Sequence, residues 1–140
     1  MADATTAYKK PLPKRRGYAG QFYEFCKKHE LRFQRCTDCG AWRHVPRDMC
    51  AKCGSFNWEW AKSSGKGKIY SWTTAEQTML PQFADVTPYS PAIVELEEGV
   101  RMVTWITDIP NEELKLDIPV EVVFDDVTPE VTLPKFRRAR

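Results

Sequence analysis

The spacing of hydrophobic positions changes along this chain, from a helical period near its start to alternation in its second half. One set of aromatic and apolar residues recurs at intervals of three and four, which predicts an amphipathic helix over residues 19–30. The set comprises Tyr18, Phe22, Phe25, Cys26 and His29. A helix of this length is marginal by itself, so its aromatic face must pack on its own chain or dock on another subunit.

Alternating apolar residues predict strands over most of the remaining chain. Three short strands are expected in the first half, at residues 31–35, 41–45 and 56–60. Four more are expected in the second half, at residues 69–77, 92–96, 100–109 and 120–127. Four or five such strands favour a small closed barrel of the OB type, because a sandwich needs more strands. The fold class is therefore mainly β with an N-terminal helix.

Two Cys-x-x-Cys knuckles interrupt the first group of strands, and a glycine follows each. Zn²⁺ prefers four thiolates in a tetrahedron at about 2.3 Å, and one knuckle supplies two neighbouring sulfurs. Glycine tolerates the positive φ that turns amide N–H groups toward the sulfurs. The pattern predicts a zinc ribbon holding one structural zinc ion, with no open position for substrate. The predicted ligands are Cys36, Cys39, Cys50 and Cys53. Two disulfides or a redox pair are the alternatives.

Length and composition limit the remaining possibilities. The 140 residues, 42% of them hydrophobic, suffice for one ordinary domain or two very small ones. The first twenty residues lack the apolar stretch of a signal peptide, and no run approaches the ~20 apolar residues of a membrane span. These features favour a soluble, cytoplasmic protein in a reducing compartment. The fifth cysteine, Cys26, is expected to be an unliganded thiol on the helix.

Charge is strongly segregated behind a formal net charge of +2. Residues 1–20 hold five Lys or Arg against Asp3 alone, and residues 135–140 hold four against no acid. Residues 85–131 are the reverse, with twelve Asp or Glu against Arg101 and Lys115. An acidic second half repels phosphates, which argues against nucleic acid as the partner. Both basic ends are interpreted either as docking segments or as solvated tails.

Several ordered segments together resemble the DUF35 family. The first is Cys36-Thr-Asp-Cys39 with its flanking residues, and the second is the knuckle from Pro46 to Gly54. The later matching segments are residues 64–73, 89–96, 99–101, 119–124 and 133–136. The resemblance covers about residues 19–136. This chain has Asp117 where the family pattern usually has glycine, in the turn before the strand at residue 120.

The resemblance implies a domain order and a role. It implies a rubredoxin-like zinc ribbon followed by an OB-fold, in a small accessory subunit whose partner is a catalytic protein of the thiolase superfamily that processes acyl-CoA. The expected reaction is carbon–carbon bond cleavage or formation, with degradation favoured. The expected organisation is a basic flexible arm (1–16), an amphipathic docking helix (17–31), a zinc ribbon (32–62), an OB-fold (63–134) and a basic tail (135–140).

Catalysis by this chain alone is not expected. The only histidines are His29 on the helix and His44 on a ribbon strand, and neither belongs to a recurring pattern of acids and bases in the sequence. A mobile basic turn, comprising Lys62, Lys66 and Lys68, is a candidate for meeting the phosphates of coenzyme A, although such turns are commonly solvated hairpins. Two alternatives to the accessory subunit stay open: a nucleic-acid-binding ribbon and OB module, and a free-standing redox or metal-handling protein.

Overall fold

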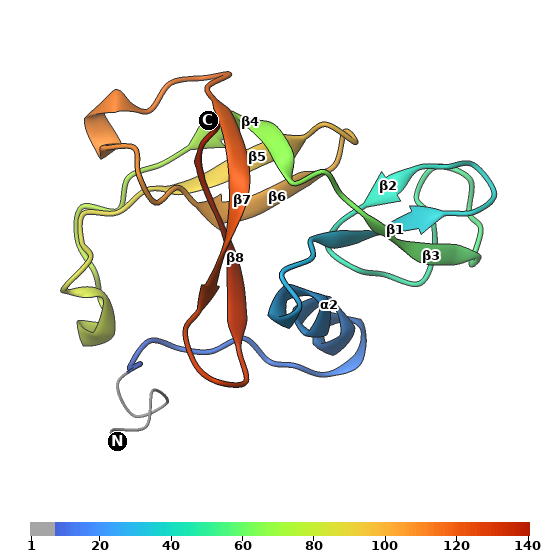
Figure 1. The fold of residues 1–140 in the computed structure, drawn as a ribbon, viewed down its shortest axis with the longest axis horizontal. Coiled ribbons are helices and arrows are strands. Elements are labelled where there is room, and N and C mark those ends of the chain that lie inside the picture. Colours follow the sequence, from blue (N-terminus) through green and yellow to red (C-terminus); the bar gives the residue numbers. More distant parts are fainter. Residues whose placement is uncertain (1–7) are drawn as a thin grey trace.

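The computed structural model describes residues 8–140, which form one helix, two antiparallel sheets and two short 3-10 turns (Figure 1). Helix α2 spans Gly17–Lys27 and ends three residues before the predicted end. His29 adopts a left-handed conformation with a φ of 58°, and its amide bonds Cys26 O at 2.9 Å while the next amide bonds Phe25 O at 3.0 Å. These two bonds form a Schellman motif, which satisfies the last helical carbonyls and stops the helix.

The first sheet is the ribbon, with strand order β2-β1-β3. Its strands are β1 (Arg32–Cys36), β2 (Trp42–Arg43) and β3 (Trp58–Lys62). Strand β1 lies in the centre and pairs antiparallel with both neighbours. The strand predicted at residues 41–45 is shorter than expected, because the chain leaves the sheet after two residues.

The second sheet has the order β6-β5-β4-β7-β8 and curls into the half-barrel of an OB-fold. Its strands are β4 (Lys66–Trp72), β5 (Pro91–Leu96), β6 (Arg101–Trp105), β7 (Pro119–Asp126) and β8 (Thr132–Arg138). The 3-10 turns η1 (Pro81–Phe83) and η2 (Asn111–Glu113) lie in the connections before β5 and after β6. The edges meet where Ile106 bridges Phe136 and the Thr104 hydroxyl bonds Pro134 O at 3.2 Å.

Strand β8 was not expected from the sequence, which assigned residues 135–140 to a basic tail. Burial alternates along it, with Thr132, Pro134 and Phe136 buried between more exposed neighbours. Lys135 and Arg137 occupy outward positions of that alternation, so the strand is amphipathic despite its charge. The predicted tail is therefore, for most of its length, the last strand of the barrel.

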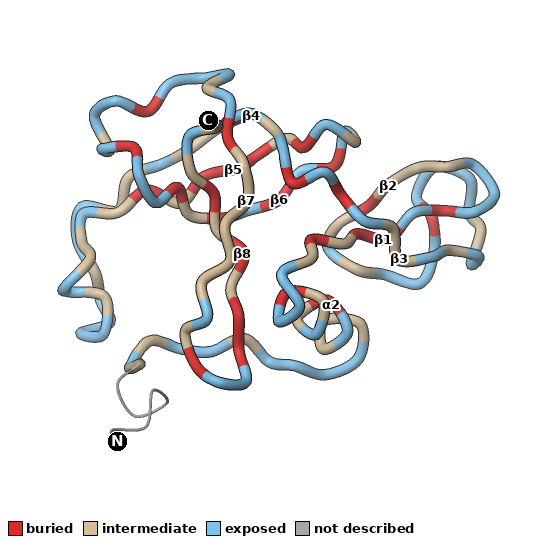
Figure 2. The backbone as a smooth tube through the Cα atoms, in the orientation of Figure 1, coloured by how far each residue is buried: buried red, intermediate tan, exposed pale blue. Residues whose placement is uncertain are grey.

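One hydrophobic core joins the helix, the ribbon and the barrel (Figure 2). Phe22 and Cys26 of α2 are buried with Phe33 of the ribbon and with barrel residues such as Ile69 and Phe136. The aromatic face of the helix also packs Phe25 on Trp60 and Tyr18 on Trp58, with ring centroids 5.5 and 5.2 Å apart. This face covers the ribbon of its own chain. It is therefore not exposed for contact with another subunit, which was the role expected of a docking helix.

The basic ends fold back onto the acidic barrel. Lys10 Nζ lies 3.2 Å from Asp85, and an Arg15 guanidinium nitrogen bonds Glu130 O at 3.3 Å. The arm crosses the end of the β7–β8 hairpin, as Figure 1 shows. On β8, Lys135 pairs with Asp125 of β7 at 2.6 Å. The described part of the arm is thus held by its own chain, while residues 1–7 lie outside the described residues. No helix among the described residues is long and apolar enough to cross a membrane.

The turn before β7 has Asp117 at the position where the family pattern usually has glycine. Its φ is 67°, a conformation that glycine adopts without strain and that most other residues avoid. The Asp117 amide still bonds Ile69 O at 2.8 Å, and its carboxylate lies 3.5 Å from the Lys68 ammonium. The turn therefore keeps its left-handed geometry with aspartate in the place of glycine.

Candidate metal centre and candidate ligand-binding surfaces

The two cysteine knuckles are built alike. In each, the first cysteine amide bonds a carbonyl beyond the knuckle at 2.8 Å, and the following glycine amide returns to that cysteine's carbonyl at 2.9 Å. The glycines, Gly40 and Gly54, both have a φ of 78°. Asp38 links the knuckles, since its carboxylate accepts hydrogen bonds from Ser55 and Asn57. The two halves of the site are thus locked in matching geometry.

The four sulfurs converge as a single metal site. All four lie within 4.8 Å of one another, and Sγ–Sγ distances are 3.6 Å for Cys36–Cys53 and for Cys39–Cys50. A tetrahedron with metal–sulfur bonds of about 2.3 Å has edges of about 3.8 Å. Sulfur pairs joined by a disulfide would be about 2.05 Å apart. The site therefore fits one tetrahedral Zn²⁺, and four protein ligands leave no position for substrate.

Backbone amides favour the thiolate form of two of the four ligands, Cys36 and Cys50. Hydrogen bonds from the amides of Cys53 and Lys52 lower the pKa of the Cys50 thiol to about 6. The Cys39 amide lies 3.5 Å from the Cys36 sulfur and lowers the pKa of that thiol. Such bonds favour the thiolate, which is the form that coordinates metal. Cys26 lies apart from the cluster, and burial raises the pKa of its thiol to about 12, which makes it unreactive.

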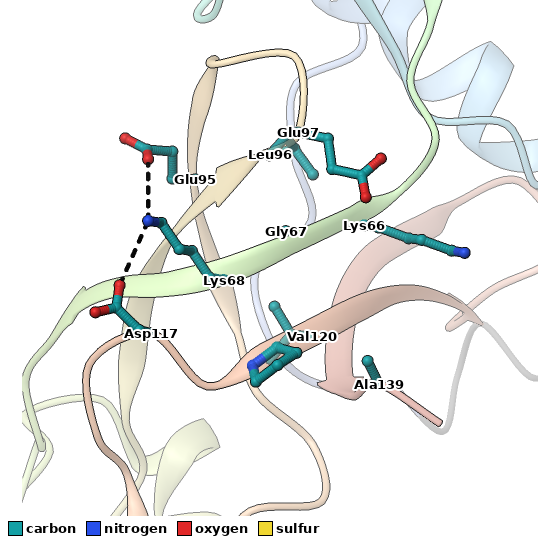
Figure 3. A pocket seen from close by; sticks show the side chains of 10 residues that line it. Lys66, Gly67, Lys68, Glu95, Leu96, Glu97, Asp117, Val120 and Ala139 are labelled. Carbon is teal, nitrogen blue, oxygen red and sulfur yellow. Dashed lines mark ion pairs between the residues drawn. The ribbon is translucent and has the colours of Figure 1, made fainter.

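The predicted coenzyme A lysines do not form one cluster. Lys66 and Lys68 line a cavity of about 500 Å³ beside β4, whereas Lys62 does not line it (Figure 3). Three carboxylates line the same cavity: Glu95, Glu97 and Asp117. Lys68 lies 3.9 Å from Glu95 and 3.5 Å from Asp117. Carboxylates outnumber ammonium groups there, which disfavours a phosphate. Coenzyme A binding by these lysines stays a prediction.

The fold gives His29 an acidic neighbour that the sequence did not reveal. Its Nε2 lies 3.1 Å from Asp126, 97 residues away, and its ring stacks on Phe124. The Thr132 hydroxyl donates to the same carboxylate at 2.5 Å and lowers the pKa of Asp126, with a further contribution from His29. The threonine bonds the acid rather than the histidine, so nothing here activates a nucleophile. The contact ties the end of α2 to the β7–β8 hairpin.

His44 lies in an apolar setting. Its ring centroid is 5.1 Å from those of Phe22 and Phe33, and burial lowers the pKa of His44 to about 4. It is neutral at pH 7, and no hydrogen-bonded acid or nucleophile accompanies it among residues 8–140. Among the described residues, His29 thus pairs with Asp126, whereas His44 has no acidic partner.

Two family profiles match the chain in sequence order. The rubredoxin-like zinc ribbon domain of ChsH2 matches residues 24–59, and the C-terminal OB-fold domain of ChsH2 matches residues 60–125. Together they cover the metal site and most of the barrel. Their common boundary falls within β3, in agreement with a ribbon that leads directly into the barrel.

Related proteins carry names from coenzyme A metabolism and from scaffolding. The chain is 38% identical over 118 residues to a probable enoyl-CoA hydratase alpha subunit of Thermomonospora curvata, which covers 84% of this chain and 36% of that protein. It is 35% identical over 105 residues to a DUF35 domain-containing scaffold protein of Methanothermobacter thermautotrophicus, covering 74% and 78% of the two chains. The chain therefore spans about a third of the first relative and most of the second.

A solved structure resembles this one over nearly the whole chain. The structure titled Ltp2-ChsH2(DUF35) aldolase superposes with a TM-score of 0.80 at 36% identity, over 94% of this chain and 100% of that chain. A DUF35 protein from Sulfolobus solfataricus shares the fold at a TM-score of 0.57 and 14% identity. From its ribbon, its barrel and these matches, the chain belongs to the DUF35 family.

Proposed function

We propose that this chain is the non-catalytic accessory subunit of an acyl-CoA-processing complex whose catalytic subunit belongs to the thiolase superfamily. The observation that carries the proposal is the match to the DUF35 chain of the Ltp2-ChsH2 aldolase, over the whole of that chain at a TM-score of 0.80. The proposed reaction is cleavage or formation of a carbon–carbon bond in an acyl-CoA. The chain stabilises the catalytic subunit in this role and holds its own shape through the zinc ribbon.

The chemistry of the described residues supports a non-catalytic role. The metal site is closed by four cysteines, and the remaining thiol of Cys26 is buried and unreactive. His29 and His44 lack a nucleophile to activate. A nucleic-acid-binding role has less support, because the basic arm and strand β8 already bond acidic groups of the barrel.

Exposed apolar side chains provide surface for a partner. Val45 and Phe56 of the ribbon are 70% and 69% exposed, and Val103 of β6 is 69% exposed. Met79, in the long connection before β5, is 99% exposed. Large exposed apolar groups on a small protein commonly mark contacts with other proteins. This placement supports docking through the ribbon loops and the barrel rather than through helix α2.

The test is co-expression of the tagged chain with a thiolase-superfamily protein from the same organism. A stable complex is expected on size-exclusion chromatography, with acyl-CoA turnover by the complex and none by this chain alone. Cys39→Ser is expected to lose zinc and the complex together, whereas Cys26→Ser keeps both because it is not a ligand. Turnover by the isolated chain, or its failure to associate, would contradict the proposal.

A further inference from the structure

Three buried polar atoms in the ribbon lack a hydrogen-bond partner. They are Nε2 of Gln34, Nη1 of Arg43 and Nδ1 of His44, and they are the only such side-chain atoms among the described residues. Gln34 and Arg43 face each other across β1 and β2. Buried polar groups are nearly always paired, so unpaired nitrogens on these two neighbouring residues indicate a missing partner. Amide and guanidinium nitrogens are donors, so that partner is an acceptor.

Arg43 is a buried cation without a counter-charge. Its exposed fraction is 6%, and no carboxylate of residues 8–140 lies within 4.0 Å of its guanidinium group. Its remaining nitrogens are occupied, since Nε donates to Gln34 Oε1 at 3.0 Å and Nη2 donates to Arg47 O at 2.9 Å. A buried charge held only by neutral acceptors is costly, which favours binding of an anion nearby.

Arg43 also lines a cavity of about 370 Å³ between the ribbon and the β5–β6 turn. Its cationic lining residues are Arg43, Arg47, Lys52 and Arg101, and no carboxylate of residues 8–140 lines it. Arg101 already bonds Glu95 at 3.0 Å, but Arg47 and Lys52 are exposed and have no ion-pair partner within the described range. The cavity beside Lys66 and Lys68 has the opposite character, with more acids than bases.

We propose that this cavity is an oxyanion-binding site that takes a phosphate group, held chiefly by Arg43, Arg47 and Lys52. Phosphate is favoured because it carries up to two charges and several acceptor oxygens, which match converging guanidinium and ammonium donors. Cys50 lines the same cavity, so the metal-bound knuckle fixes one of its walls. The bound group is either inorganic phosphate or a phosphate at the nucleotide end of coenzyme A. The choice of coenzyme A rests on the proposed function.

The test titrates inorganic phosphate into the zinc-loaded full chain by calorimetry, with sodium chloride at matched ionic strength as the blank. Arg47→Gln with Lys52→Gln is expected to weaken binding at least about tenfold, since the two substitutions remove two charged donors to the phosphate. Lys27→Gln with Lys28→Gln removes the same charge at the exposed end of α2, away from this cavity, and is expected to leave binding unchanged. In the unmutated chain, the Arg43 Nε–H resonance should shift saturably with phosphate, a readout that requires no folded variant.

Coenzyme A, dephospho-coenzyme A and pantetheine then identify the source of the phosphate. Tighter binding of coenzyme A than of free phosphate assigns the site to the cofactor, and equal binding assigns it to free phosphate, so either result upholds the site. Absence of saturable binding, equal weakening by both double variants, or pantetheine binding as tightly as coenzyme A overturns it. These measurements use the isolated chain, so failure to form a catalytic complex would not affect their outcome.

Discussion

Removing one metal ligand should unfold the ribbon and leave the barrel folded. Between residues 37 and 57, the only fully buried residues are Arg43 and the ligand Cys50. Trp42 and His44 pack partly on the shared core, so the rest of this segment depends chiefly on the metal. Structural zinc contributes about 10–16 kcal/mol in zinc-finger peptides, as much as the 5–15 kcal/mol that stabilises a typical domain. Cys39→Ser is therefore expected to release the segment. By contrast, Phe33 and Leu31 are buried in the shared core and should remain anchored.

Hydrogen–deuterium exchange with a zinc assay measures this separation. In Cys39→Ser, zinc content should fall from one ion per chain to near zero, and amides of residues 37–57 should exchange at the rate of an unfolded chain. Strands β4 to β8 should stay protected. Cys26→Ser is the matched control, because it changes a buried cysteine that is not a ligand. Protection of residues 37–57 without zinc, or loss of protection throughout the barrel, would refute the reasoning.

Three further predictions concern stability. Asp117→Gly should raise the free energy of unfolding by about 1 kcal/mol, because glycine adopts a φ of 67° without strain. Urea denaturation would measure this gain, and an unchanged or lower midpoint would contradict the prediction. Phe33→Ala should lower the free energy of unfolding by about 3–5 kcal/mol, because the Phe33 ring is fully buried. A loss below about 1 kcal/mol would show that neighbouring side chains fill the space and leave no cavity. Burial lowers the pKa of His44 to about 4, so its unfolded form binds more protons between about pH 6.5 and 4, and stability falls as pH drops through that window. Thermal unfolding at pH 7 and 5.5 should show a smaller decrease for His44→Phe than for the unmutated chain, and equal decreases would exclude His44 as the cause.

Several features followed from local sequence. The knuckle spacing predicted four cysteines around one metal, and their sulfurs lie within 4.8 Å. Alternation predicted β4 to β7, although β4 begins earlier and ends earlier than expected. Strand β8 was missed because charged residues fill its outward positions and Pro134 interrupts the strand pattern. The helix was found, but its end depends on a left-handed residue, His29, that is not glycine.

The sequence by itself determined the ribbon, the helix and most strands, because knuckles, turns and alternation depend on neighbours a few residues apart. Only the tertiary structure decided which charges meet. It brought Lys10 to Asp85 across 75 residues and His29 to Asp126 across 97. It also separated the predicted coenzyme A lysines from the acid-free cavity at Arg43. Electrostatic surfaces depend on how strands from distant parts of the chain curl together, and spacing along the sequence does not encode that curvature.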